Sequence, residues 1–249
     1  MAPDTPMTTP TAFRWLLRTG LVGCLLLLVP LRAAAADDAV FERARQRMVE
    51  RQLKARDITD AAVLRAMTTV PRHRFVSPAL ASEAYSDRAL PIEEGQTISQ
   101  PYIVALMTQL LELSGFERVL EVGTGSGYQA AVLAELVKQV YTIEILPGLA
   151  ARAAARLKTL GYSQVTVRAG DGYQGWPEVA PFDAIVVTAG ATHIPEPLVK
   201  QLAEGGRLVI PVGESSGTQE LIQGRKTGGR LVTRVVIPVR FVPLVEPRR

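Results

Sequence analysis

The sequence predicts an α/β fold, in which a mostly parallel, doubly wound sheet follows an N-terminal helical extension. Short apolar stretches alternate with helical patterns from about residue 119 to residue 210. Strands that alternate with helices in this way form a parallel sheet covered on both faces. Residues 38–69 instead carry apolar side chains near helical spacing. The chain of 249 residues has room for one sizeable core with a smaller appendage.

Composition limits the chemistry that this chain can perform. The chain is 47% hydrophobic and 21% charged, which excludes a disordered tail and a collagen-like repeat. It contains one cysteine, Cys24, and two histidines, which leave no set of soft ligands for a metal site of the Cys/His type. We therefore expect a reaction that uses neither a bound metal nor a thiol.

Residues 1–36 have the pattern of a secretory signal peptide. Arg14 and Arg18 precede an apolar run that ends at Leu31, and four alanines follow before Asp37. The uncharged stretch 19–31 is shorter than the roughly 20 residues that span a bilayer, so we expect export to the periplasm without stable membrane insertion. Loss of this leader, with its three arginines and one aspartate, lowers the formal net charge from +4 to +2. The smaller charge disfavours binding to nucleic acid.

The helical extension and a long loop come next. Residues 38–56 are expected to form a helix, and Thr59-Asp60 can cap a second helix that stops before Pro71. Residues 71–100 show little periodicity, and a long unpatterned segment in a compact protein is often functional. Pro101 can open the helix that follows, because proline is favoured in the first helical turn.

From residue 119 onward we expect strands and helices in alternation, and after residue 219 strands only. The expected strands cover 119–122, 140–145, 165–167, 182–187, 207–210, 221–222, 231–239 and 241–242, and the expected helices cover 129–138, 147–160 and 195–203.

The strand 119–122 is followed by the glycine turn Gly123-Thr-Gly-Ser-Gly127 and then by a helix. A strand, a glycine turn and a helix N-terminus together form a site for a ligand that carries a nucleoside. In the dinucleotide fingerprint G-x-G-x-x-G the third glycine lies one position later than Gly127 does here. The carboxylate of Glu121 can reach an ammonium group, whereas it would repel a pyrophosphate. The ligand that fits is S-adenosylmethionine, bound by Glu121, Gly123, Gly125 and Gly127.

Two further acidic residues lie at or after the ends of the next two strands. Glu144 ends its strand 21 residues after Gly123, where an acid hydrogen-bonds ribose hydroxyls in doubly wound folds. Asp171 and Gly172 follow the third strand, and the acid suits the exocyclic amine of adenine. The position of Glu144 alone does not distinguish S-adenosylmethionine from a dinucleotide cofactor. The glycine turn, Glu121, Glu144 and the pair Asp171-Gly172, in register on successive strands, together favour S-adenosylmethionine.

The segment Gly95-Gln-Thr-Ile-Ser-Gln-Pro-Tyr102 carries a second, more specific motif. From about residue 45 to residue 245 the chain resembles the protein-L-isoaspartate O-methyltransferases. The other matching segments are 48–53, 70–76, 90–92, 119–129, 170–172, 181–185, 205–213 and 241–244. The glycine turn is shared with many methyltransferases, so the segment 95–102 carries the assignment.

The resemblance implies a Rossmann-like, class I S-adenosylmethionine-dependent methyltransferase. It implies methyl transfer to the free α-carboxylate of L-isoaspartyl residues in damaged peptides and proteins, whose ester then closes to a succinimide. We expect three parts: the leader 1–36, a helical extension with the substrate loop at 37–100, and a methyltransferase domain at 101–249. The expected partners are isoaspartyl peptides and proteins, and we expect a monomer. The family's usual compartment, the cytoplasm, is the alternative to the periplasm.

The family's active-site serine falls on Ser99, and we expect Thr97, Ile98 and Thr188 to contact the substrate. A carboxylate is already ionised at pH 7, since its pKa is about 3.5 to 4, and needs no general base. Ser99 can donate a hydrogen bond to it at an expected helix N-terminus, which favours an anion. The alternative is that Ser99 only caps this helix.

Three other functions remain open at this point. One is another S-adenosylmethionine-dependent methyltransferase, acting on a small molecule or RNA. Another is a non-catalytic module that binds isoaspartyl sites, because the cofactor is made in the cytosol and the leader predicts export. The last is a nicotinamide oxidoreductase, which the glycine spacing disfavours.

Overall fold

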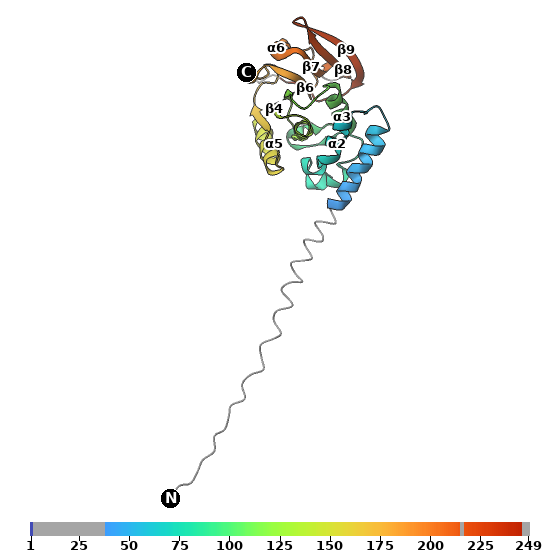
Figure 1. Cartoon of the computed structure of the whole chain (residues 1–249), viewed down its shortest axis with the longest axis vertical. Helices are drawn as coiled ribbons and strands as arrows, with labels where there is room; N and C mark the ends of the chain where they lie inside the picture. The colour runs from blue at the N-terminus through green and yellow to red at the C-terminus, as the bar shows by residue number, and fades with distance from the viewer. Residues whose placement is uncertain (2–37, 215–216, 246–249) are drawn as a thin grey trace. The chain divides into compact units, whose positions relative to one another are not determined.

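The computed structural model describes residue 1, residues 38–214 and residues 217–245 (Figure 1). The expected leader therefore lies outside the described residues, apart from Met1. The chain divides into a short N-terminal unit that ends at Val40 and a compact unit, Phe41–Arg249. The fold and the site below belong to the second unit. In the part of the chain that the structure describes, no helix has the length and apolarity needed to cross a membrane.

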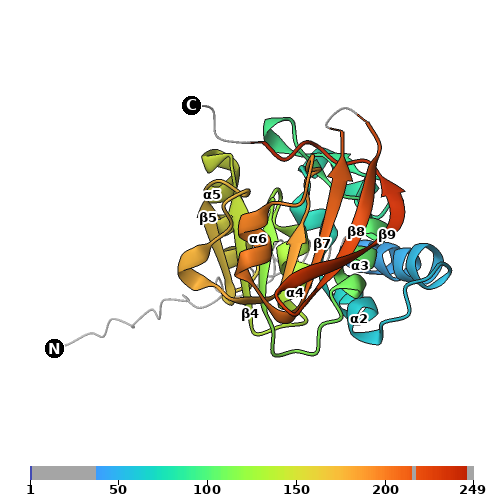
Figure 2. The same ribbon diagram turned by 90° about the horizontal axis from the view of Figure 1, so that it is seen from above.

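The compact unit is built on a seven-stranded sheet in the order β5-β4-β3-β6-β7-β8-β9. The first five strands of this order are parallel, and β8 and β9 are antiparallel to their neighbours, so the expected mostly parallel sheet is confirmed. Figure 2 shows the long strands β7 and β8 side by side. The strands are β5 (Val165–Ala169), β4 (Gln139–Glu144), β3 (Arg118–Val122), β6 (Phe182–Val187), β7 (Leu202–Gly213), β8 (Gln219–Thr227) and β9 (Arg230–Val239).

Two apolar clusters cover the sheet, one on each face. The first includes Val119 and Val140 of the strands with Leu133 and Leu157 of the helices. The second includes Leu120 and Leu198. Because alternate residues of a strand point to opposite faces, the central strands read as continuous apolar runs. The helices that connect the parallel strands are α4 (Tyr128–Ala134), α5 (Pro147–Thr159) and α6 (Glu196–Gln201).

The N-terminal extension is helical, as expected. Residues 38–48 are α-helical and continue into the π-helix η1 (Val49–Lys54). Asp60 caps α2 (Ala61–Thr69), because its side chain accepts hydrogen bonds from the backbone N–H groups of Ala62 and Val63, the second and third residues of the helix. Pro101 opens α3 (Pro101–Leu110), which packs into the first apolar cluster.

The unpatterned segment 71–100 contains three 3-10 helices and one small hairpin. Such short elements have no apolar period that a sequence could show. The hairpin joins β1 to β2 and ends directly before Ser99 and α3. The elements are η2 (Arg72–Phe75), η3 (Pro78–Glu83), β1 (Leu90–Pro91), η4 (Glu93–Gly95) and β2 (Thr97–Ile98), and a further 3-10 helix, η5 (Pro177–Val179), precedes β6.

The prediction of a strand at 241–242 is wrong. The chain leaves the sheet after Val239 and turns toward the loop that follows β6. There the N–H of Gly190 donates to the carbonyl of Val242 at 2.8 Å, and the N–H of Leu244 donates to the carbonyl of Gly190 at 2.8 Å. Pro243, which has no N–H to donate, forms only an isolated bridge with Gly190. The segment 241–245 thereby reaches the edge of the sheet where the site lies.

Candidate active site

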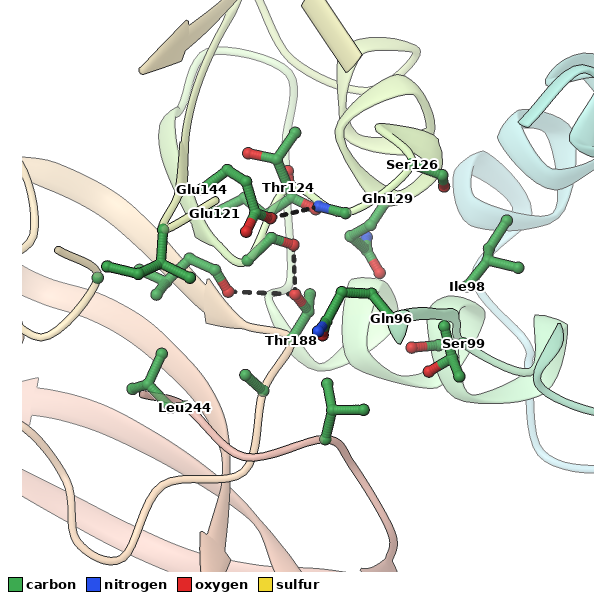
Figure 3. A pocket seen from close by; sticks show the side chains of 18 of the residues that line it. Gln96, Ile98, Ser99, Glu121, Thr124, Ser126, Gln129, Glu144, Thr188 and Leu244 are labelled. Carbon is green, nitrogen blue, oxygen red and sulfur yellow. Dashed lines mark hydrogen bonds between the residues drawn. The ribbon is translucent and has the colours of Figure 1, made fainter. Parts of the chain in front are cut away.

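A cavity of about 290 Å³ lies at the carboxyl ends of β3, β4 and β6. Its wall combines the glycine turn, the end of β4, the hairpin segment 95–99 and the C-terminal segment 242–245. Figure 3 shows Glu121 and Glu144 on the side of the glycine turn, and Ile98 and Ser99 on the opposite side. In open α/β sheets ligands bind at this edge of the strands.

The glycine turn adopts a conformation that only glycine tolerates well. Gly123, Gly125 and Gly127 have φ angles of 100°, 53° and 89°. A Cβ atom on Gly123 would lie 2.4 Å from the Oγ1 atom of Thr188. Gly123 and Gly125 line the cavity, whereas Gly127 is the N-cap residue of α4 and lies outside the lining. Gly127 therefore serves the turn itself.

Glu121 is the most unusual group of the cavity wall. Its side chain is fully buried, and its Oε2 atom accepts a hydrogen bond from the hydroxyl of Thr142 at 2.6 Å. Its Oε1 atom has no hydrogen-bond partner among the described residues. Burial raises the pKa of Glu121 to about 8; the bond from Thr142 lowers it and the charge of Glu144 raises it further. A buried oxygen without a partner on the cavity wall fits the ammonium group of S-adenosylmethionine.

Glu144 connects the glycine turn to the end of β4. Its two carboxylate oxygens accept hydrogen bonds from the N–H groups of Gly125 at 2.9 Å and Leu146 at 3.1 Å. The residue is buried and lines the cavity, as the sequence predicts for a group that binds ribose hydroxyls.

Of the pair that follows β5, the structure brings only Gly172 to the cavity. A Cβ atom on Gly172 would lie 2.5 Å from the side chain of Val122, so the position has no room for a larger residue. Asp171 lies outside the lining, and its Oδ1 atom accepts a hydrogen bond from the N–H of Tyr173 at 2.9 Å.

Ser99 stands between the cavity and a second pocket of about 370 Å³. Ser99, Thr97 and Thr188 line both, and Ile98 lines the first. The hydroxyl of Ser99 forms no hydrogen bond with another described residue, and α3 has no side-chain cap. The interpretation of Ser99 as only a helix cap is therefore wrong. The N-cap is the next residue, Gln100, because the helix begins at Pro101.

The hydroxyl of Thr188 is already used inside the protein. It donates to the carbonyls of Gly123 at 2.6 Å and Val122 at 3.1 Å, so it fixes the end of β6 against the glycine turn. This contact leaves Thr188 on the wall of both pockets as a structural neighbour of the glycine turn.

Several lining residues have no signal that sequence analysis could use. Thr124, Ser126 and Gln129 lie in or just after the glycine turn, where only the glycines form a motif. The C-terminal segment 242–245 is apolar and resembles a strand. Thr142, which lies behind the wall, also has no signal in the sequence, because its role comes from the neighbouring strand, where Glu121 is its register partner.

Among the residues described, no group of three or more His, Cys, Asp or Glu side chains could hold a metal ion.

The sheet order, the glycine turn and the two acids at the ends of β3 and β4 define a class I S-adenosylmethionine-dependent methyltransferase. A family model described as Protein-L-isoaspartate(D-aspartate) O-methyltransferase (PCMT) matches residues 43–249. The chain belongs to this family, whose reaction is the methylation of L-isoaspartyl residues that begins their repair.

Individual relatives agree with the family assignment. The chain is 57% identical over 228 residues to a protein-L-isoaspartate O-methyltransferase of Opitutus terrae, with 90% of this chain and 98% of that protein covered. It is 58% identical over 205 residues to one of Syntrophobacter fumaroxidans, with 82% and 95% covered.

Two solved structures share the fold. One is a protein-L-isoaspartate O-methyltransferase with a TM-score of 0.73 and 32% identity, with 80% of this chain and 65% of that chain covered. The other, from Plasmodium falciparum, is described as a putative member in complex with S-adenosyl-L-homocysteine. Its TM-score is 0.71 and its identity 30%, with 81% and 98% covered.

Proposed function

We propose that, in the isoaspartyl methylation that this enzyme performs, Ser99 holds the acceptor carboxylate at the junction of the two pockets. The cavity at the glycine turn would take the cofactor, and the second pocket would take the isoaspartyl peptide. The single observation that carries this proposal is the placement of Ser99, whose hydroxyl has no hydrogen-bond partner among the described residues and lies on the wall that both pockets share.

The reaction requires positioning more than acid–base chemistry. The bound cofactor supplies an electrophilic methyl group on a sulfonium. The acceptor carboxylate held by Ser99 would take this methyl group, and the electron pair of the broken carbon–sulfur bond would stay on sulfur. No proton moves, and the two opposite charges disappear together. The enzyme therefore accelerates the step mainly by alignment and exclusion of water.

The chain's own residues suit these tasks. We propose that the Oε1 atom of Glu121, which has no partner in the described part of the chain, binds the cofactor's ammonium group and that Glu144 binds the ribose hydroxyls. Gly123 and Gly125 let the cofactor approach the main chain, and the close packing of Gly172 forms the adjoining wall. We propose that Asp171, next to Gly172, binds the adenine amine.

The substitution Ser99→Ala tests the proposal. Removal of one hydrogen bond to a charged acceptor should lower kcat/KM for an isoaspartyl peptide by roughly ten- to a hundredfold. The Kd of S-adenosylhomocysteine, measured by calorimetry, should stay within about twofold, because the hydroxyl faces the acceptor. Unchanged kcat/KM, or an equal loss of cofactor binding, would contradict the assigned role.

We also propose that the chain is exported and functions in the periplasm. The basic, apolar and alanine-rich pattern of residues 1–36 supports this proposal. Cell fractionation with mass spectrometry of the chain's N-terminus tests it. A shortened chain in the periplasmic fraction would support export, and a full-length chain in the cytoplasm would overturn it. Light scattering on the same material tests the expected monomer.

A further inference from the structure

The hairpin that carries the acceptor side of the site is too small to hold itself in place. β1 and β2 contain two residues each and pair antiparallel, and an isolated two-stranded hairpin is only marginally stable. Its turn includes Glu94, which has a positive φ of 55°, next to Gly95 at 70°. The hairpin nevertheless supplies Thr97 and leads directly into Ser99. Contacts from outside the hairpin must therefore fix the position of Ser99.

Two ion pairs from α5 reach the turn of this hairpin. Arg156 pairs with Glu93 at 3.1 Å, and Arg152 pairs with Glu94. The arginines are one helical turn apart, so they lie on the same face of α5. The two pairs therefore hold adjacent residues of one turn against one helix, and they form a matched pair for comparison.

The two arginines differ in what else they bind. The Nη1 atom of Arg156 donates to the carbonyl of Ser126, inside the glycine turn, at 2.8 Å, while its Nη2 atom reaches Glu93. Arg152 hydrogen-bonds only Glu94 among the described residues. The side chain of Arg156 is 20% exposed and that of Arg152 is 43% exposed. A planar guanidinium that is already fixed by one bond loses less freedom when it makes the second.

We propose that Arg156 is a positioning residue, which sets the separation between the glycine turn and the hairpin that carries Ser99. One side chain links the wall that faces the cofactor to the wall that faces the acceptor, from outside the cavity. The separation of these walls fixes the distance between the methyl group and the acceptor oxygen. Misplacement of reacting groups by about 1 Å can cost a hundredfold in rate. This inference rests on the proposed role of Ser99.

The test compares Arg156→Gln and Glu93→Gln with the matched controls Arg152→Gln and Glu94→Gln in the full chain. We expect Arg156→Gln to lower kcat for an isoaspartyl peptide by roughly tenfold. It should also raise the Kd of S-adenosylhomocysteine, because the glycine turn loses a contact. Glu93→Gln should lower kcat without changing that Kd, because the bond between Arg156 and Ser126 remains. The two control variants should keep kcat within about twofold, as expected for an exposed ion pair.

The double variant Arg156→Gln with Glu93→Gln should be no slower than Arg156→Gln alone, because both changes remove one linkage. Equal losses of kcat in Arg152→Gln and Arg156→Gln, or losses that add in the double variant, would overturn the inference. If Arg156→Gln does not fold, Glu93→Gln against Glu94→Gln decides the question. A fully active Ser99→Ala enzyme would instead overturn the role of Ser99, while the contrast between the two arginines could still be measured.

Discussion

The hydroxyl of Thr142 on β4 donates a 2.6 Å hydrogen bond to the carboxyl group of Glu121 on β3, its register partner in the sheet. The same hydroxyl lies 2.6 Å from that of Thr124 in the glycine turn. All three side chains are buried. The chain of contacts fixes one oxygen of Glu121 inside the protein, so that the other is left to the cavity.

Cofactor binding should depend on pH through Glu121. Its pKa of about 8 means that the carboxyl group is largely protonated at neutral pH before the cofactor binds. An ammonium group prefers the ionised form, so binding should release a proton, and affinity should rise toward pH 8 by at most about tenfold per pH unit. Calorimetry with S-adenosylhomocysteine between pH 6 and pH 9 measures this. Glu121→Gln should bind more weakly and should lack this part of the pH dependence; the same profile in both proteins would contradict the assignment.

The same pKa predicts how the stability of the cofactor-free protein changes with pH. The folded pKa lies above the ordinary value of 4.5, so the folded state holds the proton more tightly than the unfolded state. The free energy of unfolding should therefore fall as pH rises from about 4.5 to about 8. Urea denaturation at pH 5 and pH 8 measures this change in the free energy of unfolding for the native protein and for Glu121→Gln. The native protein should lose more stability than the variant over this interval, and equal changes would argue against a raised pKa.

Thr142→Val should weaken cofactor binding although Thr142 does not line the cavity. Valine has nearly the same shape but removes the hydroxyl between Glu121 and Thr124, and an unpaired buried polar group costs about 1–3 kcal/mol. We expect a roughly tenfold higher Kd for S-adenosylhomocysteine. Thr142→Ser keeps the hydroxyl and should restore most of the affinity. Equal binding by the valine and serine variants would show that the hydroxyl is not needed.

Gly123→Ala should destabilise the protein more than Gly161→Ala. Both glycines have a positive φ, of 100° and 87°, so both substitutions strain the backbone by about 1 kcal/mol. Only at Gly123 would the new Cβ atom meet the hydroxyl of Thr188, at 2.4 Å, whereas nothing lies within 4 Å at Gly161. Denaturant titration should give an extra loss of about 1–3 kcal/mol for Gly123→Ala. Similar losses at the two positions would mean that Thr188 moves aside freely.

Arg240 should assist binding of the acidic acceptor. It is an exposed cation on the wall of the second pocket, which Ser99 also lines. Arg240→Ala should raise KM for an isoaspartyl peptide by roughly three- to tenfold at low salt and less at high salt, with the KM of the cofactor unchanged. Arg230→Ala removes an exposed cation at the other end of β9 and is the control. A KM effect that is equal in both variants would indicate only the loss of general charge.

The parts of the fold that depend on local patterns could be predicted from the sequence. The Asp60 cap, the proline that opens α3 and the apolar strands around the glycine turn are local signals, and each appears where expected. Glu121 and Glu144 could be placed for a similar reason, because the ends of neighbouring parallel strands meet at one edge of the sheet.

The remaining features depend on contacts between segments that are far apart in the sequence. Residues 241–242 are expected to form a strand, but the segment lies outside the sheet and its backbone pairs with Gly190. Arg156 belongs to an ordinary amphipathic helix, and only the folded chain brings it to Ser126 and Glu93. The distant partners of these residues therefore do not appear in any local pattern.

The most direct test of isoaspartyl methylation by this protein is the transfer of a labelled methyl group from S-adenosylmethionine to one peptide made in an isoaspartyl form and an aspartyl form. We expect label to enter the isoaspartyl peptide only, and the methylated peptide then to close to its succinimide. Equal labelling of both peptides, or no labelling of either, would contradict it.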